Sequence, residues 1–467
     1  MCCAASGLAA AVEHAGDAGA PGEVFVDASA APGGDGSLRR PFRELRQALG
    51  RGRIHLATGV YPAAVLLDGV EVVGGSAVVL SASPPEACLR TRGEVLLREV
   101  QIQGGAAGLR VETGRATLES VRFSGQRGPA VEVGSGAALV LSRSTVQASV
   151  SGLPGVRIQP GGRAVLRDVQ LRGPFQRAID ADHPADLRLE GVQVADAVSG
   201  LALSGGEASL ERVEVRGGRG PGIYVSGGTL HLRDVGVSGH EYGLLTGEGA
   251  RVDGRGFRST QAARAGLGLV RARASLADVQ VDGAGQMAAV QAISSDVRLT
   301  SLVITSSRSN GLVSRDSRLV LERTQISGVR SEDRDEGDGL QLRGGTATVS
   351  GLRVQGCSGI GLLAAEGATV TLRQSSVSEA GVAGMSVETE ATLTASEVSI
   401  EGTRGPAVLA MSRGTARLRA ITGRANQSGS VWAECSQGAL VEVDGWMGDR
   451  PPTPAPCIRP SAVNPPR

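Results

Sequence analysis

Short alternating runs of apolar and polar residues fill the chain from about residue 107 onward. Residues 108–125 read GLRVETGRATLESVRFSG and residues 200–218 read GLALSGGEASLERVEVRGG, with Gly-rich steps between the runs. An alternation with a period of two is typical of β-strands, whereas an amphipathic helix repeats about every 3.6 residues. The pattern therefore predicts two or three short strands in each segment.

These segments form an internal repeat. The period is mostly 21 to 23 residues, and the copies begin near residues 108, 130, 155, 178, 200, 222, 243, 266, 289, 311, 339, 361, 384, 406 and 429. One copy cannot bury its apolar side alone, but stacked copies share a continuous core. The leucine-rich-repeat signature is missing, and the copies vary too much in length for a hexapeptide helix. The sequence predicts an all-β solenoid, a right-handed parallel β-helix of about fifteen coils of roughly 22 residues.

The stretch before the repeats has a different pattern and predicts an N-terminal cap at residues 23–80. Pro41 is expected to begin a short amphipathic helix in which Phe42, Leu45 and Leu49 share one face. The open end of a sheet recruits other chains unless something covers it, so this helix is expected to cap the solenoid. We expect a flexible segment at residues 1–22, one β-helix domain at residues 23–449 and a tail at residues 450–467.

The cap region resembles the opening of pectin-lyase-like β-helix proteins. It combines a strand, Gly-Asp-Gly-Ser at residues 34–37, Pro-Phe with a helix, and TGVYPAAVLL at residues 58–67. The resemblance implies a right-handed parallel β-helix and an exported protein, often active on or bound to polysaccharide. That superfamily also holds many non-enzymes, so two functions stay open. One is a non-catalytic surface scaffold or binding protein, and the alternative is a polysaccharide lyase or glycoside hydrolase acting on an acidic polysaccharide.

The C-terminal tail, residues 450–467, is rich in proline and is expected not to join a sheet. It is either an extended covering strand or a disordered tail. Cys435 and Cys457 can pair in a disulfide if the tail folds back. An outward column of the last coils turns apolar, which predicts a contact with the tail or with a partner. The residues of this column are Leu245, Val313, Leu363, Leu409 and Trp432, with Met411 beside them.

Composition and charge narrow the range of partners. The formal net charge is +1 with both signs interspersed, which argues against a nucleic-acid partner because such a partner needs a basic stripe. No apolar run approaches the length of a membrane-spanning helix. The start of the chain, with Cys2 and Cys3 before a small-residue stretch, resembles the mature start of a bacterial lipoprotein. We expect an exported protein of the outer membrane, cell surface, periplasm or medium, with polysaccharide or another cell-surface protein as partner. The alternative is a disordered N-terminus with incidental cysteines.

The candidate catalytic residues are Asp180, Asp182 and His183, in RAIDADHPADL at residues 177–187. Glycoside hydrolases use a pair of carboxylates, and residues two apart on one strand point to the same side. The Asn-Thr-Asp, Asp-Asp, Gly-His-Gly and Arg-Ile-Lys signatures of polygalacturonases do not appear in this sequence.

The repeat register offers a structural role for the first aspartate. The outward positions of four successive coils read Arg110, Glu132, Arg157 and Asp180, with alternating signs. Such a column predicts a ladder of ion pairs on a sheet face. Asp182 has no cationic neighbour in its column, so Asp182 and His183 remain the candidates, and we expect them at the surface.

The one clear insertion, GVRSEDRDEGDG at residues 328–339, holds the candidate metal ligands. Asp333, Asp335, Glu336 and Asp338 could bind calcium through carboxylate oxygens. The segment fits neither an EF-hand loop nor a Gly-Gly-x-Gly-x-Asp repeat, so a solvated surface loop is the alternative. No other cofactor is predicted. GHEYG at residues 239–243 is expected to be a turn with a half-buried tyrosine.

Overall fold

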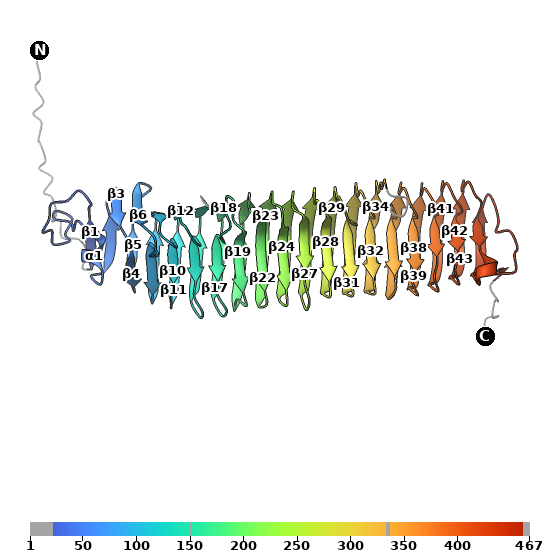
Figure 1. The fold of residues 1–467 in the computed structure, drawn as a ribbon, viewed down its shortest axis with the longest axis horizontal. Coiled ribbons are helices and arrows are strands. Elements are labelled where there is room, and N and C mark those ends of the chain that lie inside the picture. The colour runs from blue at the N-terminus through green and yellow to red at the C-terminus, as the bar shows by residue number, and fades with distance from the viewer. Residues whose placement is uncertain (1–21, 149–150, 333–336, 461–467) are drawn as a thin grey trace, which may run out of the picture.

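The computed structural model describes residues 22–148, 151–332 and 337–460. Figure 1 shows a straight rod of stacked turns that begins with the N-terminal residues at one end and finishes with the C-terminal residues at the other. All pairings between named strands are parallel, because each strand lies beside the equivalent strand of the next turn. Two sheets, A and B, run along the rod and enclose the core.

Sheet B has one strand in each of seventeen turns. Its strands are β4 Val65–Asp68, β7 Leu89–Arg92, β10 Leu109–Val111, β13 Val131–Val133, β16 Val156–Ile158, β19 Arg177–Asp182, β22 Ser199–Ser204, β24 Pro221–Ser226, β26 Tyr242–Thr246, β28 Ala265–Val270, β30 Val290–Ile293, β32 Leu312–Arg315, β35 Leu340–Arg343, β38 Leu362–Ala365, β40 Met385–Val387, β42 Val408–Ala410 and β44 Val431–Ala433. At about 4.8 Å between strands, they span roughly 80 Å.

Sheet A is bent along its length into two limbs, which we call A1 and A2. The separate A1 strands are β1 Glu23–Val26, β2 Arg53–Leu56, β5 Glu71–Val73, β8 Glu94–Arg98, β11 Arg115–Glu119, β14 Ala138–Ser142, β17 Arg163–Arg167, β20 Asp186–Glu190, β33 Arg318–Glu322 and β36 Thr346–Ser350. The separate A2 strands are β3 Gly59–Pro62, β6 Val78–Ala82, β9 Gln101–Gly104, β12 Arg122–Ser124, β15 Thr145–Gln147, β18 Gln170–Arg172, β21 Gln193–Ala195, β34 Gln325–Ser327 and β37 Arg353–Gln355. Nine longer strands run through both limbs: β23 Glu207–Arg216, β25 Thr229–Ser238, β27 Arg251–Thr260, β29 Arg273–Asp282, β31 Asp296–Thr305, β39 Thr369–Ser378, β41 Thr392–Glu401, β43 Thr415–Arg424 and β45 Leu440–Gly448.

From the turn that holds β8 and β9 onward, a single left-handed residue makes the bend between limbs A1 and A2. In three successive turns the bend lies at Asp234 (φ 54°), Gly256 (φ 72°) and Asp278 (φ 53°). Glycine and short polar residues adopt positive φ most readily, which explains why they recur just before the last apolar run of a repeat. The whole series is Glu99, Ser120, Arg143, Asp168, Gly191, Arg212, Asp234, Gly256, Asp278, Ser301, Arg323, Gly351, Gln374, Glu397, Ala420 and Gly445.

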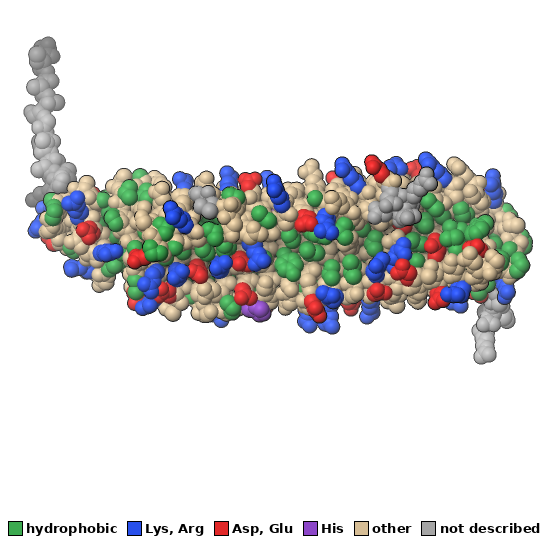
Figure 2. Space-filling model, viewed as in Figure 1, with side chains coloured by type: hydrophobic (Ala, Val, Ile, Leu, Met, Phe, Trp, Pro, Cys, Tyr) green, Lys and Arg blue, Asp and Glu red, His purple; other side chains and the backbone are tan. Residues whose placement is uncertain are grey.

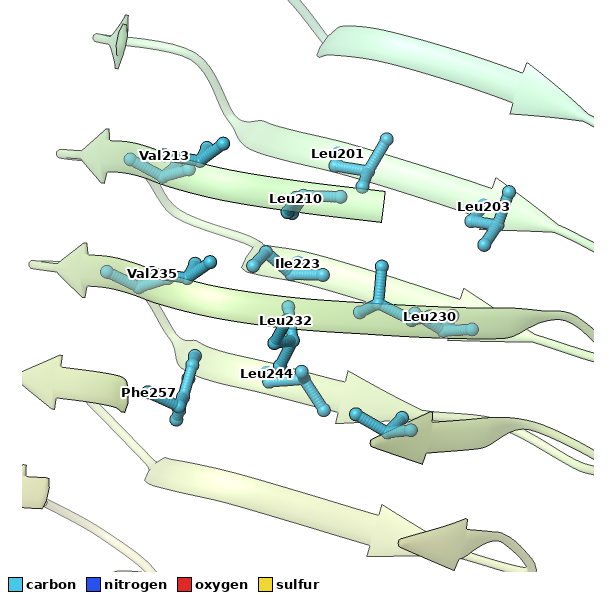
Figure 3. Packing of buried hydrophobic residues seen from close by; sticks show 14 of the residues in the cluster. Leu201, Leu203, Leu210, Val213, Ile223, Leu230, Leu232, Val235, Leu244 and Phe257 are labelled. Carbon is cyan, nitrogen blue, oxygen red and sulfur yellow. The ribbon is translucent and has the colours of Figure 1, made fainter. Parts of the chain in front are cut away.

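The core lies between sheet B and the two limbs, and it is built from the apolar residues of the alternation. Figure 3 shows Leu201 and Ile223 of sheet B among Leu210 and Val235 of sheet A, with all four side chains buried. The glycine that opens many repeats lets sheet B and limb A2 approach closely. A Cβ atom at Gly222 would lie 2.3 Å from a methyl carbon of Val237. The Gly-apolar step is therefore a packing requirement, because a larger residue would overfill the core.

The prediction of about fifteen coils was two turns too low. The cap region itself forms the first turns, because β2 pairs with β5, β3 with β6 and β4 with β7 in the same parallel arrangement as the repeats. Their sequences differ from the later copies, so the similarity between repeats did not show them. The fold class is confirmed, and the solenoid starts earlier in the chain than the repeat does.

The predicted capping helix is reduced to one turn, α1 Leu45–Ala48. Phe42 lies outside it: the Phe42 backbone N–H donates to the Phe25 carbonyl at 2.9 Å, and the Asp27 N–H donates to the Phe42 carbonyl at 2.8 Å. The start at Pro41 was wrong because this segment pairs with the edge of β1 and so satisfies backbone groups that a helix would use. Phe42 and Leu45 are nevertheless buried. Among the described residues, no helix is long and apolar enough to cross a membrane.

The tail closes the C-terminal end of the rod. Cys435, in the 3₁₀ turn η1 Cys435–Gln437, forms a disulfide with Cys457. β46 Ile458–Pro460 then pairs with β45. The expectation that the proline-rich tail joins no sheet was therefore wrong for its described part, because an edge strand tolerates proline. In its described part the tail pairs at the end of the rod, and Trp432 of the apolar column stays 47% exposed. Residues 1–21 and 461–467, including Cys2 and Cys3, lie outside the described residues.

Candidate functional site

The outward face of sheet B carries the candidate catalytic residues. Each strand contributes one central outward residue, and these residues form a single column along the rod, the B column. The members of the B column are Leu66, Arg90, Arg110, Glu132, Arg157, Asp180, Ala202, Tyr224, Leu245, Gly268, Gln291, Val313, Gln341, Leu363, Ser386, Leu409 and Trp432. It is charged from Arg90 to Asp180 and uncharged beyond. Figure 2 shows a row of charges over the N-terminal half of the rod and hydrophobic patches over the C-terminal half.

Two of the three steps of the ladder predicted in the charged half are ion pairs. Arg110 Nε lies 2.9 Å from Glu132 Oε2, and Arg157 Nε lies 3.8 Å from Asp180 Oδ2. Arg177, on the same strand as Asp180, lies closer still, with Nη1 2.8 Å from Asp180 Oδ1. Asp180 is therefore the shared counter-ion of two guanidinium groups, which leaves it a structural role in the ladder.

Asp182 and His183 are brought together at the next corner. His183 Nδ1 lies 2.7 Å from Asp182 Oδ1, and their side chains are 68% and 59% exposed. His183 has a φ of 39°, a left-handed conformation that Gly205 adopts one turn later. A Cβ atom at Gly205 would lie 2.4 Å from the imidazole, so the ring rests against that glycine. The pair is a surface contact, as expected from its place in the turn.

Only one of the four candidate calcium ligands, Asp338, lies within the described residues. Asp333, Asp335 and Glu336 lie outside the described residues. Asp338 is buried, its Oδ1 accepts the Ile360 N–H at 2.7 Å, and its Oδ2 accepts from Gln341 Nε2 at 3.2 Å. Burial raises the pKa of the Asp338 carboxyl to about 6. Within the described chain no group of three or more His, Cys, Asp or Glu residues could hold a metal ion.

Asp338 belongs to a short buried polar ladder that the sequence did not predict. One turn earlier, Asn310 Oδ1 accepts the backbone N–H groups of Gly337 and Asp338, at 3.0 and 2.8 Å. Asn310 and Asp338 therefore satisfy the backbone where the chain returns from the insertion. Asp338 acts here as a backbone acceptor, and it was predicted as a metal ligand because the insertion hides the repeat register.

Two tyrosines lie one turn apart in the uncharged half of sheet B. Tyr224 is in the B column beside Leu245, and Tyr242 starts the same strand as Leu245. A Cβ atom at Gly247 would lie 3.0 Å from the Tyr224 hydroxyl, and one at Gly268 would lie 3.4 Å from Tyr242 Cδ1. Each ring therefore extends over a glycine of the next turn. We call Tyr224, Tyr242 and Leu245 the tyrosine platform.

Polar groups lie next to the Tyr242 end of the platform. The Arg264 guanidinium lies 5.3 Å from the centre of the Tyr242 ring, and Arg264 Nη1 lies 2.9 Å from Glu241 Oε1. The Tyr242 hydroxyl donates to Met287 Sδ at 3.4 Å. His240, also in the GHEYG turn, is buried, and burial lowers its pKa. Tyr242 was predicted as a half-buried turn residue, but its position opposite Pro221, on the strand next to that of Tyr224, was missed. The sequence signal that could have shown it is the glycine that follows each tyrosine one repeat later, Gly247 and Gly268, because it leaves room for the ring.

Comparison with known proteins identifies a right-handed β-helix region in the chain. Residues 266–427 match the family model of the right-handed β-helix region. The catalytic unit of a GH87 α-1,3-glucanase from Streptomyces thermodiastaticus is 15% identical, with 91% of this chain and 68% of that chain covered and a TM-score of 0.30. Tailspike protein 3 of bacteriophage CBA120 is 12% identical, with 92% of this chain and 62% of that chain covered and a TM-score of 0.31. PfbA, a surface adhesin of Streptococcus pneumoniae, is 10% identical, with 86% of each chain covered and a TM-score of 0.26. No curated protein matches the chain. The chain therefore has a right-handed parallel β-helix fold, as its cap and repeats predicted.

Proposed function

We propose that the protein is a non-catalytic binding protein that holds a polysaccharide against the tyrosine platform of sheet B. The observation that carries this proposal is the position of Tyr224 and Tyr242, two of only three tyrosines in a chain with 2% aromatic residues. Aromatic rings offer apolar contact area with a polar edge, which suits the mixed apolar and hydroxyl surface of a sugar. The third tyrosine, Tyr61, is fully buried in the core.

The polar groups around the platform support the same class of ligand. The Glu241–Arg264 pair can accept and donate hydrogen bonds beside the Tyr242 ring, and Gln291 lies further along the B column. A binding site needs a few such directional groups to select among sugars that present similar apolar faces. The open sheet face runs past the platform in both directions, so an extended chain fits it better than a small ligand.

The alternative is a polysaccharide lyase or glycoside hydrolase that acts on an acidic polysaccharide. The 2.7 Å contact between Asp182 and His183 favours it, because a carboxylate that orients an imidazole is a recurring acid/base arrangement. Two further observations support the non-catalytic function. Asp180 is held by Arg157 and Arg177, and the Asp182–His183 pair is mostly exposed to solvent.

The proposed location is outside the cytoplasm, in the periplasm, at the outer membrane or cell surface, or in the medium. The Cys435–Cys457 disulfide supports this location, because such bonds persist in oxidising compartments. A lipid on Cys2 or Cys3 is part of the proposal. Mass spectrometry of the protein purified from its own membranes tests it, and an unmodified N-terminal peptide would contradict it.

A polysaccharide panel with the full chain tests the function. Calorimetry should detect binding, while assays for new reducing or unsaturated ends should stay at background with and without calcium. Tyr224→Ala and Tyr242→Ala should each weaken binding about two- to tenfold, because an aromatic contact is worth about 0.5–1.5 kcal/mol. Phenylalanine at the same positions should retain most of the affinity. Turnover that Asp182→Ala abolishes would establish the enzyme instead.

A further inference from the structure

The two end strands of sheet B differ in how well their inward side chains are covered. In the first strand, β4, the inward residues Val65 and Leu67 are 5% and 0% exposed. In the last strand, β44, the inward residues Val431 and Ala433 are partly exposed, although the residues that they face in β42 are fully buried. The tail closes this end of the rod at limb A1, where β46 pairs with β45. In the described chain it therefore leaves the last strand of sheet B with an uncovered edge.

The backbone of β44 has unpaired groups along this edge. Among the described residues, β44 pairs only with β42. The Ser430 carbonyl and the Glu434 N–H both bond to β42, at 2.9 Å each. Since backbone groups alternate in direction along a strand, those of Val431 and Ala433 point away from β42, and no backbone group of the described chain bonds to them. Such an edge can pair with another extended chain.

An exposed aromatic side chain lies directly beside the uncovered edge. Trp432 is the central outward residue of β44, faces Leu409 of β42 and is 47% exposed. Glu434 follows two residues later, which places it on the same side of the sheet. Glu434 Oε1 accepts from Gln437 Nε2 at 2.8 Å, and across the described residues its carboxylate has no cationic partner within 4.0 Å. The edge therefore presents an indole ring next to a carboxylate without a counter-ion.

The column that contains Glu434 is acidic over its last turns. Glu388, Met411 and Glu434 each donate their backbone N–H to the strand of the preceding turn in the same way, so they align along the rod. Glu388 accepts from Ser386 Oγ at 2.6 Å and, like Glu434, has no cation within 4.0 Å in the described chain. In the charged half of sheet B, by contrast, Glu132 lies 2.9 Å from an arginine. The charge at this end of the sheet favours a cationic partner.

We propose that the edge of β44 binds an extended segment of a partner protein, with an arginine side chain of that segment over Trp432 and beside Glu434. An extended segment adds to a sheet edge through main-chain hydrogen bonds, and its alternate side chains give specificity. The residue in register with the B column would follow Trp432 by about 4.8 Å. A guanidinium there stacks on the indole and pairs with the carboxylate. This contact goes beyond the polysaccharide platform, which lies in β24 and β26.

The charges favour a basic partner over a second copy of this chain. A closed pair of identical chains uses the same patch on both, so two copies would bring the same acidic edges together. Like charges placed opposite one another destabilise a sheet. The other end of the rod offers no comparable site, because Val65 and Leu67 of β4 are covered. A segment that carries an arginine supplies the charge that this edge lacks.

A fluorescence titration of the full chain tests the site. In Trp446→Phe, Trp432 is the one remaining tryptophan of the sequence and reports binding directly. The probe is the peptide acetyl-Ser-Thr-Val-Arg-Val-Thr-Ser-amide, whose valines would continue the columns of Val431 and Ala433. The same peptide with glutamine in place of arginine should bind at least about fivefold more weakly. N-methylation of its Val-Arg-Val residues should abolish binding, because it removes the donors of the added strand.

Variants of the protein test the same contacts from the other side. Glu434→Gln should weaken binding of the arginine peptide about threefold or more and leave binding of the glutamine peptide unchanged. Glu390→Gln is the matched control, since Glu390 is an exposed carboxylate of a neighbouring turn that already pairs with Arg413. It should stay within about twofold of its parent.

Each outcome decides one part of the proposal. No binding of the arginine peptide at about 1 mM would overturn the site. Equal affinity for the arginine and glutamine peptides would overturn the basic partner, and binding that survives N-methylation would overturn strand addition. A dimer in sedimentation velocity that excess arginine peptide does not dissociate and that Trp432→Ala does would make a second copy the occupant. Tyr224→Ala should leave peptide affinity unchanged, so this proposal and the polysaccharide platform can fail separately.

Discussion

The two halves of the B column share one backbone and differ only in what they present to solvent. From Arg90 to Asp180 the outward side chains are charged and pair along the rod. From Ala202 to Trp432 they are small, apolar or uncharged. The inward residues are the same aliphatic kind in both halves. Only the inward positions are needed to form the solenoid, so the outward ones are free to differ in function.

The two halves also differ in whether their outward side chains find partners within the protein. In the charged half, contacts such as Arg110–Glu132 and Arg177–Asp180 satisfy each charged group within the protein. In the uncharged half Trp432 is 47% exposed and Tyr224, Leu245 and Val313 are partly exposed, whereas Leu363 is buried. Exposed apolar groups that recur on one face usually mark a contact surface. We therefore assign binding to the C-terminal half, and the following experiments test that division.

Removal of the C-terminal disulfide should have the largest effect on stability. A cross-link that closes a loop with a sequence separation of 22 residues contributes about 3 kcal/mol. The variant Cys435→Ser/Cys457→Ser should therefore open the end of the rod. Hydrogen exchange should show lost protection in β44 and β45 and unchanged protection in β10 and β13, because each turn contacts only its neighbours. Equal loss in all four strands would show that the halves do not unfold separately.

Asp338 gives the stability of the uncharged half a dependence on pH. Its folded pKa of about 6 exceeds the ordinary value of 3.8, so the folded state binds the proton more tightly than the unfolded state. The free energy of unfolding should fall as the pH rises from about 4 to about 6, by roughly 1.4 kcal/mol per unit of pKa difference. Asp338→Asn keeps the acceptor for the Ile360 N–H and removes the titrating group. As the pH rises over that range, the free energy of unfolding of the variant should therefore increase by about 2 kcal/mol relative to that of the wild type.

Urea unfolding of both proteins at pH 4, 5, 6 and 7 measures this gain. The informative quantity is the difference between the two proteins, since other groups titrate equally in both. Asn310→Ala is a useful control, because it damages the same corner without a titrating group and should shift stability equally at every pH. A constant difference between Asp338→Asn and the wild type would mean that the buried carboxyl has an ordinary pKa.

The sequence predicted the features that the repeat enforces. The alternation placed Asp180 on the outward face, and the repeat period aligned it with Arg157, as the structure has them. Side chains at equivalent positions must stack, because parallel strands in register repeat the same geometry in every turn. Fold class, face and column therefore followed from the pattern alone.

Features that break the repeat were not predictable in the same way. The helix at Pro41 failed because pairing of Phe42 with β1 competes with helix formation, and local propensity does not show this competition. Asp338 looked like a loop carboxylate because the insertion shifts the register. The contact between Tyr242 and Arg264 joins residues of neighbouring corners, where side chains follow no period.

The smallest effect should come from the ladder of the charged half. Glu132→Gln removes the partner of Arg110 while keeping an acceptor for Gln159, whose Nε2 donates to Glu132 at 3.0 Å. Exposed ion pairs are worth about 0.2–1 kcal/mol and weaken as salt screens them. The variant should therefore lose less than about 1 kcal/mol at low salt and nothing at high salt. Gln291→Ala, in the uncharged half of the same column, should show no salt dependence. If the loss in free energy of unfolding of Glu132→Gln persisted at high salt, its cause would be lost packing and not a lost ion pair. The two halves of the column would then differ less than their charges suggest.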